Sequence, residues 1–505
     1  MLEISSYLLE NHQLVKLSMI EELMKNEDSS IIYTELAHLL KVKPCNLERY
    51  IKELSADLFA YGLDDKVKIH LFEGQVFGTI SIDYHPILLE RLYIMESVGY
   101  QLFGDIFFNH FRTLTYFVDE NELTMPSVNL RIKRLNEFLS KYALKLNFRK
   151  KKCPLIGKEK QIRYFAFCLF SSIQEGGDWL FSSRLHESIP ERFISLLINA
   201  GMSQNYFFNE KMKVLIAVTL IRVRGGYEIE ENVEDLWLLD NPLLSYTNFR
   251  REFFLPMANE TKIHACNKEK ECLFFYFLFS CLNTYMMKDC TSLASNLLNF
   301  YSCADCKFSQ MWLEQFQQDF KLPLSVELYS CLLVNLYYLH RFVTVFSGNY
   351  FGYNGEGVIE RFAVGYPEEL SQMQQFIDHL KEIDEIGFES LVENNSYLLF
   401  QYGIILKAIL ERHISTLYLV YLSKTSSLQV NIMKTRLFSH SPVRIIFQET
   451  INSKTDGVIT DFPISSAISK GKPVFNLHPV PTNQEKKNIW LFISELTREK
   501  LLQHL

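Results

Sequence analysis

A helix-turn-helix pattern occurs twice in the first third of this chain, and the second copy follows the first at a distance of 81 residues. In the first copy, residues 34–58 contain a short helical pattern, a break before Pro44 and a second helix. A shift of 81 residues places Thr115 where the first copy has Thr34, and the pattern continues through the turn into the second helix. Agreement across two helices and their turn is far more specific than one amphipathic helix, so the sequence predicts a duplicated helix-turn-helix unit.

The second helix of each copy has a single apolar stripe. Its apolar residues follow the spacing i, i+4, i+7, i+11, which places them on one side of a helix. They are Leu47, Ile51, Leu54 and Leu58 in the first copy and Val128, Ile132, Leu135 and Leu139 in the second. Such a helix packs its stripe against its own module and leaves the opposite face for DNA, as a recognition helix does.

The polar faces of these two helices supply the candidate DNA-binding residues. Side chains of these types can bond to base edges or to phosphates. In the first copy they are Asn46, Arg49, Tyr50 and Lys52. In the second copy they are Asn129, Arg131, Lys133 and Arg134.

Each helix pair is followed by a short alternating stretch that predicts a β wing. These stretches are residues 67–82 and 144–156. The second wing carries four consecutive cations, Arg149, Lys150, Lys151 and Lys152. A run of cations on a hairpin supplies charge with little directional geometry, so we expect it to contact phosphates and not to read bases.

Charge is distributed unevenly along the chain, although the net charge of −7 is acidic. Residues 125–163 contain twelve Lys and Arg against two acids, Glu137 and Glu159. A basic segment that coincides with a helix-turn-helix pattern is typical of nucleic-acid binding. The sequence therefore predicts double-stranded DNA as a partner of the N-terminal third.

Length and composition favour several folded domains in the cytoplasm. A chain of 505 residues exceeds one hydrophobic core, and 48% hydrophobic with 22% charged residues fits ordered domains. The N-terminus lacks the basic start and apolar run of a secretion signal. The most apolar stretch, Cys272–Leu282, is far shorter than the roughly 20 residues that cross a bilayer, so we expect a buried helix and no membrane contact.

The ten cysteines do not indicate a metal site. Cys303 and Cys306 form one CxxC pair, but zinc needs two further ligands at a matching spacing, and the sequence offers none. In a cytosolic chain, scattered cysteines are more often reduced and buried. We predict neither a metal ion nor a cofactor.

Beyond residue 163 the chain divides into a helical region and a small α/β region. Residues 164–410 follow a helical pattern without a strand series, and the similarity of residues 214–224 to 331–341 suggests two related helical domains. After residue 414, short strands alternate with helices. The predicted fold is a mainly α multidomain protein, with domains 1–84, 85–163, 164–288, 289–410 and 411–505.

The order of these parts resembles the Mga/AtxA family of global virulence regulators of Gram-positive bacteria. The resemblance covers nearly the whole chain. It identifies Mga-type helix-turn-helix units at residues 31–58 and 115–139, two domains similar to phosphotransferase-system (PTS) regulation domains, called PRD-like, and a flavodoxin-like end domain similar to enzyme IIB.

This resemblance implies a promoter-binding transcription regulator and not an enzyme. It further implies activation of virulence or carbohydrate-linked genes, and a homodimer or higher oligomer formed through the C-terminal domain. PTS phosphocarrier proteins would control the regulator by phosphorylating histidines.

The resemblance also implies where such histidines would lie, namely in helices of the regulation domains. His340 fits this pattern best, and His379, His264 and His186 match it less well. An ordinary histidine on a helix surface or core edge is the alternative for each. The enzyme IIB-like domain lacks the phosphoacceptor cysteine after its first strand, where Ser423–Ser427 stand, so we expect a structural or dimerising copy without phosphotransfer activity.

Three other functions stay open on this sequence. The first is a PTS component that passes phosphate through histidine and cysteine, and the missing cysteine counts against it. The second is an RNA-binding antiterminator with PRD-like domains, which would begin with a small β-rich module. The third is a scaffold that binds no nucleic acid and whose retention on DNA would not fall with salt.

Overall fold

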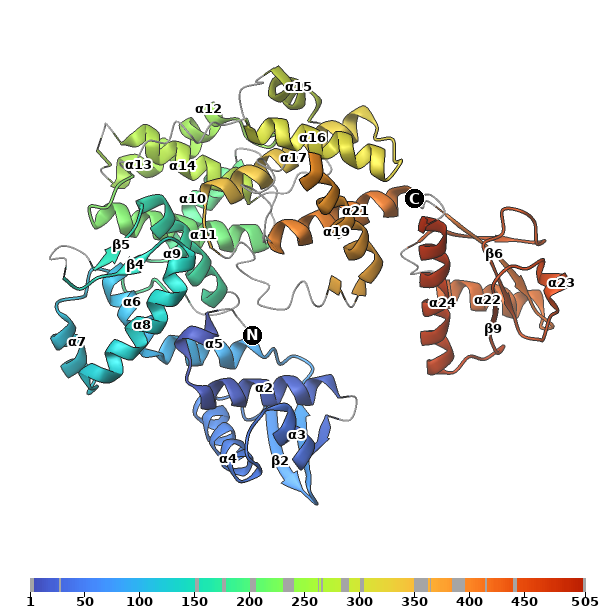
Figure 1. Ribbon diagram of the computed structural model, residues 1–505, viewed down its shortest axis with the longest axis horizontal. Helices are drawn as coiled ribbons and strands as arrows, with labels where there is room; N and C mark the ends of the chain where they lie inside the picture. Colours follow the sequence, from blue (N-terminus) through green and yellow to red (C-terminus); the bar gives the residue numbers. More distant parts are fainter. Residues whose placement is uncertain are drawn as a thin grey trace. The chain divides into compact units, whose positions relative to one another are not determined.

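The structure is a computed structural model, and it describes most of the chain (Figure 1). The described residues are 4–26, 29–149, 154–174, 179–199, 206–229, 240–261, 263–264, 267–282, 290–299, 304–348, 362–363, 365–383, 396–413, 416–438 and 443–502. They belong to two compact units. Unit 1 comprises residues 1–309 and 330–361, and unit 2 comprises residues 310–329 and 362–505.

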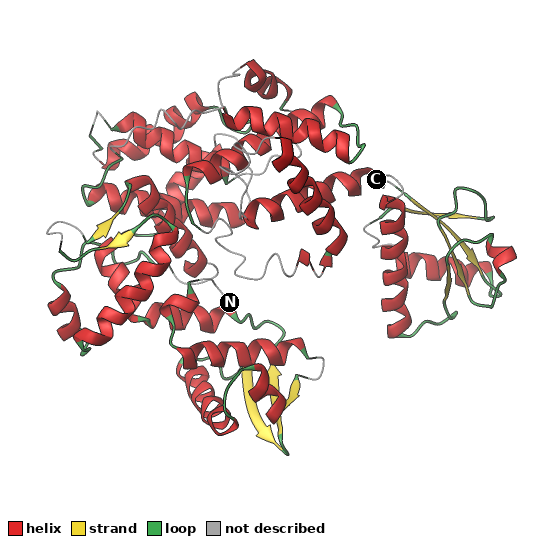
Figure 2. Ribbon diagram, viewed as in Figure 1, coloured by secondary structure: helices red, strands yellow, loops and turns green. Residues whose placement is uncertain are grey.

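Unit 1 starts with α1 (Ser5–Leu8) and continues into what we call the first winged module, residues 11–80. Its elements are α2 (Asn11–Lys25), β1 (Ser30–Ile32), α3 (Tyr33–Leu39), α4 (Pro44–Ala60), β2 (Val67–Phe72) and β3 (Gln75–Ile80). The strands form an antiparallel sheet in the order β1-β3-β2 (Figure 2). The β2–β3 hairpin turns at Glu73 and Gly74, which both have the positive φ that a two-residue hairpin turn needs.

Helix α4 forms as its sequence predicts. Pro44 is its first residue, a position where the missing N–H of proline costs no hydrogen bond. The stripe Leu47, Ile51, Leu54 and Leu58 is buried throughout. Burial of this face orients the opposite, polar face of α4 outward.

The second winged module, residues 87–156, repeats two helices and a hairpin. Its elements are α5 (Ile87–Glu96), α6 (Val98–Phe107), α7 (Leu114–Glu120), α8 (Met125–Lys141), β4 (Lys145–Leu146) and β5 (Leu155–Ile156). Thr113 caps α7 by accepting the backbone N–H of Tyr116 at 3.1 Å. The stripe of α8, Val128, Ile132, Leu135 and Leu139, is buried like that of α4.

The remainder of unit 1 is helical. It comprises α9 (Glu159–Gln174), α10 (Ser188–Asn199), α11 (Tyr206–Arg224), α12 (Tyr246–Asn248), the π-helical η1 (Phe249–Phe254), α13 (Leu255–Thr261), α14 (Lys268–Cys281), α15 (Thr291–Asn299) and parts of α16 (Ala304–Asp319) and α17 (Val326–Val345). The apolar residues 274–279 of α14 are fully buried, as expected for a core helix. None of the helices in the described part of the chain combines the length and apolarity that crossing a membrane requires.

A buried ion network joins three of these helices. Arg163 of α9 pairs with Glu271 of α14 at 2.5 Å, and Arg222 of α11 pairs with Glu159 of α9 at 2.6 Å. Burial acts to lower the pKa of Arg163, but the carboxylates of Glu271 and Glu159 outweigh it and raise the pKa above its ordinary value. Because each buried charge has a partner of opposite sign, the network holds these helices in register.

Unit 2 contains the other parts of α16 and α17, the helices α19 (Pro367–Ile383) and α21 (Ser396–His413), and a small α/β part. Trp312 of α16 is buried between aromatic rings of α19 and α21, Phe376 and Tyr402. Every regular element in the described part of residues 164–410 is a helix, as the sequence pattern predicts.

The α/β part is a four-stranded parallel sheet in the order β7-β6-β8-β9. Its elements are β6 (Leu417–Leu422), α22 (Ser427–Phe438), β7 (Ile445–Gln448), β8 (Gly457–Thr460), α23 (Ser466–Ser469), β9 (Val474–Asn476) and α24 (Asn483–Leu502). The first strand lies between the second and the third, so the crevice where such sheets bind ligands is at the carboxyl ends of β6 and β8.

The prediction of a mainly helical chain with a small parallel sheet near its end is confirmed. The five domain boundaries and the PRD-like and enzyme IIB-like identities remain predictions.

Candidate nucleic-acid interface

The cations of α4 are largely neutralised by acids on the same helix. Lys52 pairs with Glu48 at 2.9 Å, and Arg49 lies 3.5 Å from Glu53. All four side chains are solvent-accessible, and Asn46 near the start of the helix is half-buried. The first recognition helix therefore presents mixed charge and no cationic stripe.

Tyr50 corrects the sequence-based assignment of this face. It was expected among the exposed polar residues, but only 8% of its surface is accessible. Tyr50 lies three residues after Leu47 and four before Leu54, so it falls at the edge of the apolar stripe. The guanidinium of Arg49 covers the ring at 5.0 Å. Tyr50 is thus a packing residue of the first winged module.

The polar face of α8 is more basic. Asn129 and Lys133 are exposed, and Arg131 and Arg134 are half-buried. Both arginines contact the carboxylate of Glu10, at 2.9 Å for Arg131 and 3.7 Å for Arg134. The four predicted residues of the second recognition helix therefore form two pairs: Asn129 and Lys133 are exposed one turn apart, whereas Arg131 and Arg134 both lie against Glu10 and are ion-paired.

The predicted basic wing is described only in part. Arg149 is exposed, and its backbone N–H donates to Asn147 at 3.0 Å. Lys150, Lys151 and Lys152 lie outside the described residues. In the first strand of this wing, β4, Lys145 is exposed and lies opposite Ile156 of β5.

Asn136 has a role that the sequence analysis missed. Its side-chain oxygen accepts the N–H of Leu146 at 2.6 Å, and its amide donates to the carbonyl of Leu146 at 3.2 Å. These two bonds attach the wing strand β4 to the recognition helix α8. The sequence signal for this role is weak: an amide residue in a helix that is followed by a predicted hairpin.

The two stretches of chain that contain the winged modules carry opposite charge. Residues 1–84 contain 8 Lys and Arg against 14 Asp and Glu, a net of −6. Residues 85–163 contain 14 Lys and Arg against 8 Asp and Glu, a net of +6. Since phosphate contacts supply most non-specific affinity, charge alone makes the second module the stronger candidate for binding a nucleic acid.

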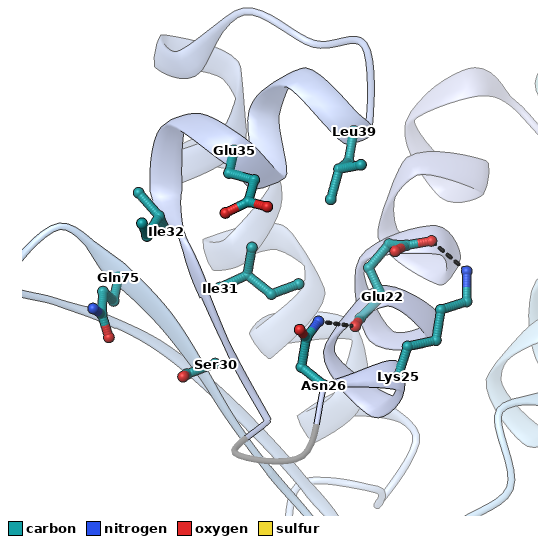
Figure 3. Close-up of a pocket in the computed structure, with 9 residues that line it drawn as sticks. All are labelled: Glu22, Lys25, Asn26, Ser30, Ile31, Ile32, Glu35, Leu39 and Gln75. Carbon is teal, nitrogen blue, oxygen red and sulfur yellow. Dashed lines mark hydrogen bonds and ion pairs between the residues drawn. The ribbon is translucent and has the colours of Figure 1, made fainter.

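A pocket of about 380 Å³ lies in the first winged module between α2, β1 and α3 (Figure 3). Ile31, Ile32 and Leu39 form its apolar walls, and Glu22 and Glu35 bring carboxylates to it. Glu22 is bonded to Lys25 at 2.5 Å. None of the lining residues belongs to α4, and the two carboxylates disfavour a phosphate, so this pocket is not part of the nucleic-acid interface.

His340, the preferred phosphorylation candidate, is inaccessible in the structure. Its side chain is fully buried in α17, where Nδ1 contacts the hydroxyl of Ser309 at 2.7 Å and Phe308 packs against the ring. Burial lowers the pKa of His340 to about 3, so the ring is neutral. The structure therefore does not favour His340 as a phosphoacceptor, because this position lies one turn after Leu336 and Tyr337 in the core of α17.

The other three candidate histidines are exposed. His186 bonds to Ser188 at 2.8 Å, and His379 of α19 bonds through Nδ1 to Asp319 at 2.9 Å. His264 bonds to Glu228 at 2.7 Å. Burial acts to raise the pKa of Glu228, but the hydrogen bonds from Asn267 and His264 outweigh it and lower the pKa.

The loop after β6 is occupied by a carboxylate from the chain itself. Asp461, directly after β8, accepts the hydroxyl of Ser423 at 2.5 Å and the N–H of Lys424 at 3.0 Å. These donors lie at the switch point of the sheet, where an anion would otherwise bind. The arrangement disfavours a phosphate at this loop, in line with the expected loss of phosphotransfer. Within the described ranges, no group of three or more His, Cys, Asp or Glu is placed to hold a metal ion.

Comparison with known proteins gives two matches. The family model of the Mga helix-turn-helix domain matches residues 87–170, which contain the second winged module. Over 290 residues the chain is 24% identical to the capsule synthesis positive regulator AcpB of Bacillus anthracis. This match covers 54% of the chain and 59% of AcpB, so the chain spans about three fifths of this relative.

Both matches agree with the resemblance stated from the sequence. The chain contains an Mga-type helix-turn-helix domain, and the resemblance to Mga/AtxA-family regulators is confirmed. Both matches are to a regulator or to a DNA-binding domain, and neither is to an enzyme, in agreement with the predicted regulatory role.

Proposed function

We propose that this chain is a transcription regulator that binds double-stranded promoter DNA, with the second winged module making most phosphate contacts. The observation that carries the proposal is the segregation of charge, +6 in residues 85–163 against −6 in residues 1–84. The Mga helix-turn-helix match supports it, because residues 87–170 include the same basic segment.

Within this module the exposed residues of α8 have distinct tasks. Asn129 is suited to an adenine edge, and Lys133 to a phosphate or a guanine. The Arg149–Lys152 wing adds affinity that does not depend on sequence. The first module contributes Asn46, Arg49 and Lys52, whose partly neutralised charge suits positioning on the duplex more than tight binding.

We also propose that the protein activates virulence or carbohydrate-linked genes. The support is the similarity to AcpB, a positive regulator of capsule synthesis.

Oligomerisation through the α/β part completes the proposal. Leu428 and Ile432 lie one turn apart on α22, with 69% and 45% of their surfaces exposed. An apolar stripe left outside the core of this small sheet suits a homodimer or a higher oligomer.

Control by PTS phosphocarrier proteins would act on an exposed histidine. We favour His379, because Asp319 holds its ring through Nδ1 and leaves Nε2 as the atom to take the phosphate. His264 and His186 are the alternatives. Each would gain about two negative charges on phosphorylation, by analogy with other phosphorylated side chains.

A binding assay on the full chain tests the central proposal. With a 30-base-pair duplex, Asn129→Ala with Lys133→Gln should weaken binding by about tenfold and lower the salt slope by about one. The matched pair Asn46→Ala with Lys52→Gln should have a smaller effect. If the unaltered chain shows no salt-dependent binding to duplex DNA, the proposal is wrong and a scaffold without nucleic acid is the better description.

A further inference from the structure

Two cations of the second recognition helix are not available as isolated charges, because one carboxylate bridges them. Glu10 places Oε1 2.9 Å from Nη2 of Arg131 and Oε2 3.7 Å from Nη1 of Arg134. Each oxygen thus faces one guanidinium. This is the arrangement in which a phosphate group would also meet two arginines.

The second terminal nitrogen of Arg131 is bonded within the protein as well. Nη1 donates to the hydroxyl of Ser127 at 2.5 Å and to its carbonyl at 3.1 Å. A bidentate bond to a guanine edge needs two adjacent guanidinium nitrogens. Arg131 must therefore break internal contacts before it can read a base.

Two hydrogen bonds to Gln13 hold Glu10 at the start of α2. Its side chain accepts the backbone N–H of Gln13, and its backbone N–H donates to the side chain of Gln13 at 3.0 Å. This reciprocal capping box fixes the direction of the Glu10 side chain.

The segment before Glu10 is docked on the second winged module. The ring of Tyr7 in α1 lies 5.1 Å from that of Phe138, and Ser5 donates to Glu90 at 2.6 Å. Gly99 permits the close approach, because a Cβ there would lie 2.5 Å from Leu8. Packing on α1 and capping of α2 together place Glu10 against α8.

We propose that Glu10 is an intramolecular counter-ion that competes with DNA phosphate for Arg131 and Arg134, and so lowers the affinity of the second recognition helix for DNA. This inference rests on the proposed DNA-binding function. Glu10 acts through the two arginines and is a positioning residue. It also caps α2, so the bridge joins the start of the first winged module to α8 of the second.

The test is the variant Glu10→Gln in the full chain. Glutamine keeps an oxygen that can accept the N–H of Gln13 and removes only the charge. The matched control is Glu35→Gln, which removes one charge from the first winged module at an exposed position for which the described residues show no ion pair. Thermal unfolding followed by circular dichroism checks that both variants remain folded.

Glu10→Gln should bind a 30-base-pair duplex about 3- to 10-fold more tightly than the unaltered chain at low salt, the range expected when two partly exposed ion pairs no longer have to be broken. The slope of log affinity against log salt should steepen by about one to two, since up to two more phosphates are neutralised. Glu35→Gln should change affinity by less than about twofold.

A double-mutant comparison separates the bridge from a general charge effect. In a chain that carries Arg131→Gln and Arg134→Gln, Glu10→Gln should have no more effect than Glu35→Gln. Equal affinities of the Glu10→Gln and Glu35→Gln single variants, or weaker binding by Glu10→Gln, would overturn the inference alone. Failure of the unaltered chain to bind duplex DNA would overturn the proposed function and the inference with it.

Discussion

The two winged modules have the same order of helix, helix and hairpin, but their exposed faces differ in charge. Helix α4 and helix α8 each span 17 residues and bury an apolar stripe of the same spacing. On α4 the cations pair with acids of the same helix, whereas on α8 two arginines pair with Glu10 from a distant part of the chain. The buried face therefore builds the module, and the exposed face decides what it binds.

The two modules also differ in a surface feature outside the predicted recognition helices. The first module has the pocket between α2, β1 and α3, with Ile32 and Leu39 exposed at its walls. Residues 1–84, which contain this module, have a net charge of −6, which opposes the phosphate backbone.

The largest effect that we expect is on local stability, and it tests whether both winged modules depend equally on their buried apolar stripes. Leu54→Ala and Leu135→Ala each remove a buried residue of the stripe, and each should cost about 2–5 kcal/mol of local stability. Amide hydrogen exchange in α4 and α8 of the full chain measures the loss. Similar losses in both modules support equivalence, and a loss of protection in one module only would break the comparison.

The next effect concerns the basic wing. Replacement of Arg149, Lys150, Lys151 and Lys152 by Gln should weaken binding to all duplex sequences by at least about tenfold and lower the salt slope by about three to four. The control replaces the first-wing cations Lys66 and Lys68 by Gln. Lys66 is already paired with Asp83 at 2.6 Å, so its loss should matter less. An unchanged slope in the four-fold variant would contradict the role of the wing.

The smallest effect that we expect concerns the two acids on α4 that pair with its cations. Glu48→Gln with Glu53→Gln removes the acids that neutralise Lys52 and Arg49. Binding to duplex DNA should tighten by a few fold at low salt, because each exposed pair is worth about 0.2–1 kcal/mol, and the gain should vanish at high salt. Measurement of affinity between low and high salt checks this. No change at either salt would mean that α4 does not approach DNA.

Sequence reasoning succeeded where a periodic pattern has one physical outcome. Leu47 to Leu58 could be assigned to the core of α4, because an apolar stripe has to be buried somewhere. Residues 272–282 could be assigned to a buried helix by length alone. The parallel strands at residues 417–476 followed from short apolar runs that alternate with helices.

The errors arose at positions where periodicity and chemistry point in different directions. Tyr50 was assigned to the polar face for its hydroxyl, but its position at the stripe edge buries it. His340 resembles a regulatory histidine, but its position one turn after the buried Leu336 and Tyr337 places it in the core. In both cases the position within the helix was the better guide.

The sequence by itself determined the secondary structure, the buried faces and the segregation of charge, because these depend on residues that are close together in the chain. Only the tertiary structure decided which charges are available. Glu10 lies more than a hundred residues from Arg131, Asp461 lies 38 residues from Ser423, and Glu271 lies 108 residues from Arg163. A charge acts over a few ångströms in space and not along the chain, so its partner is known only when the fold has brought the two together.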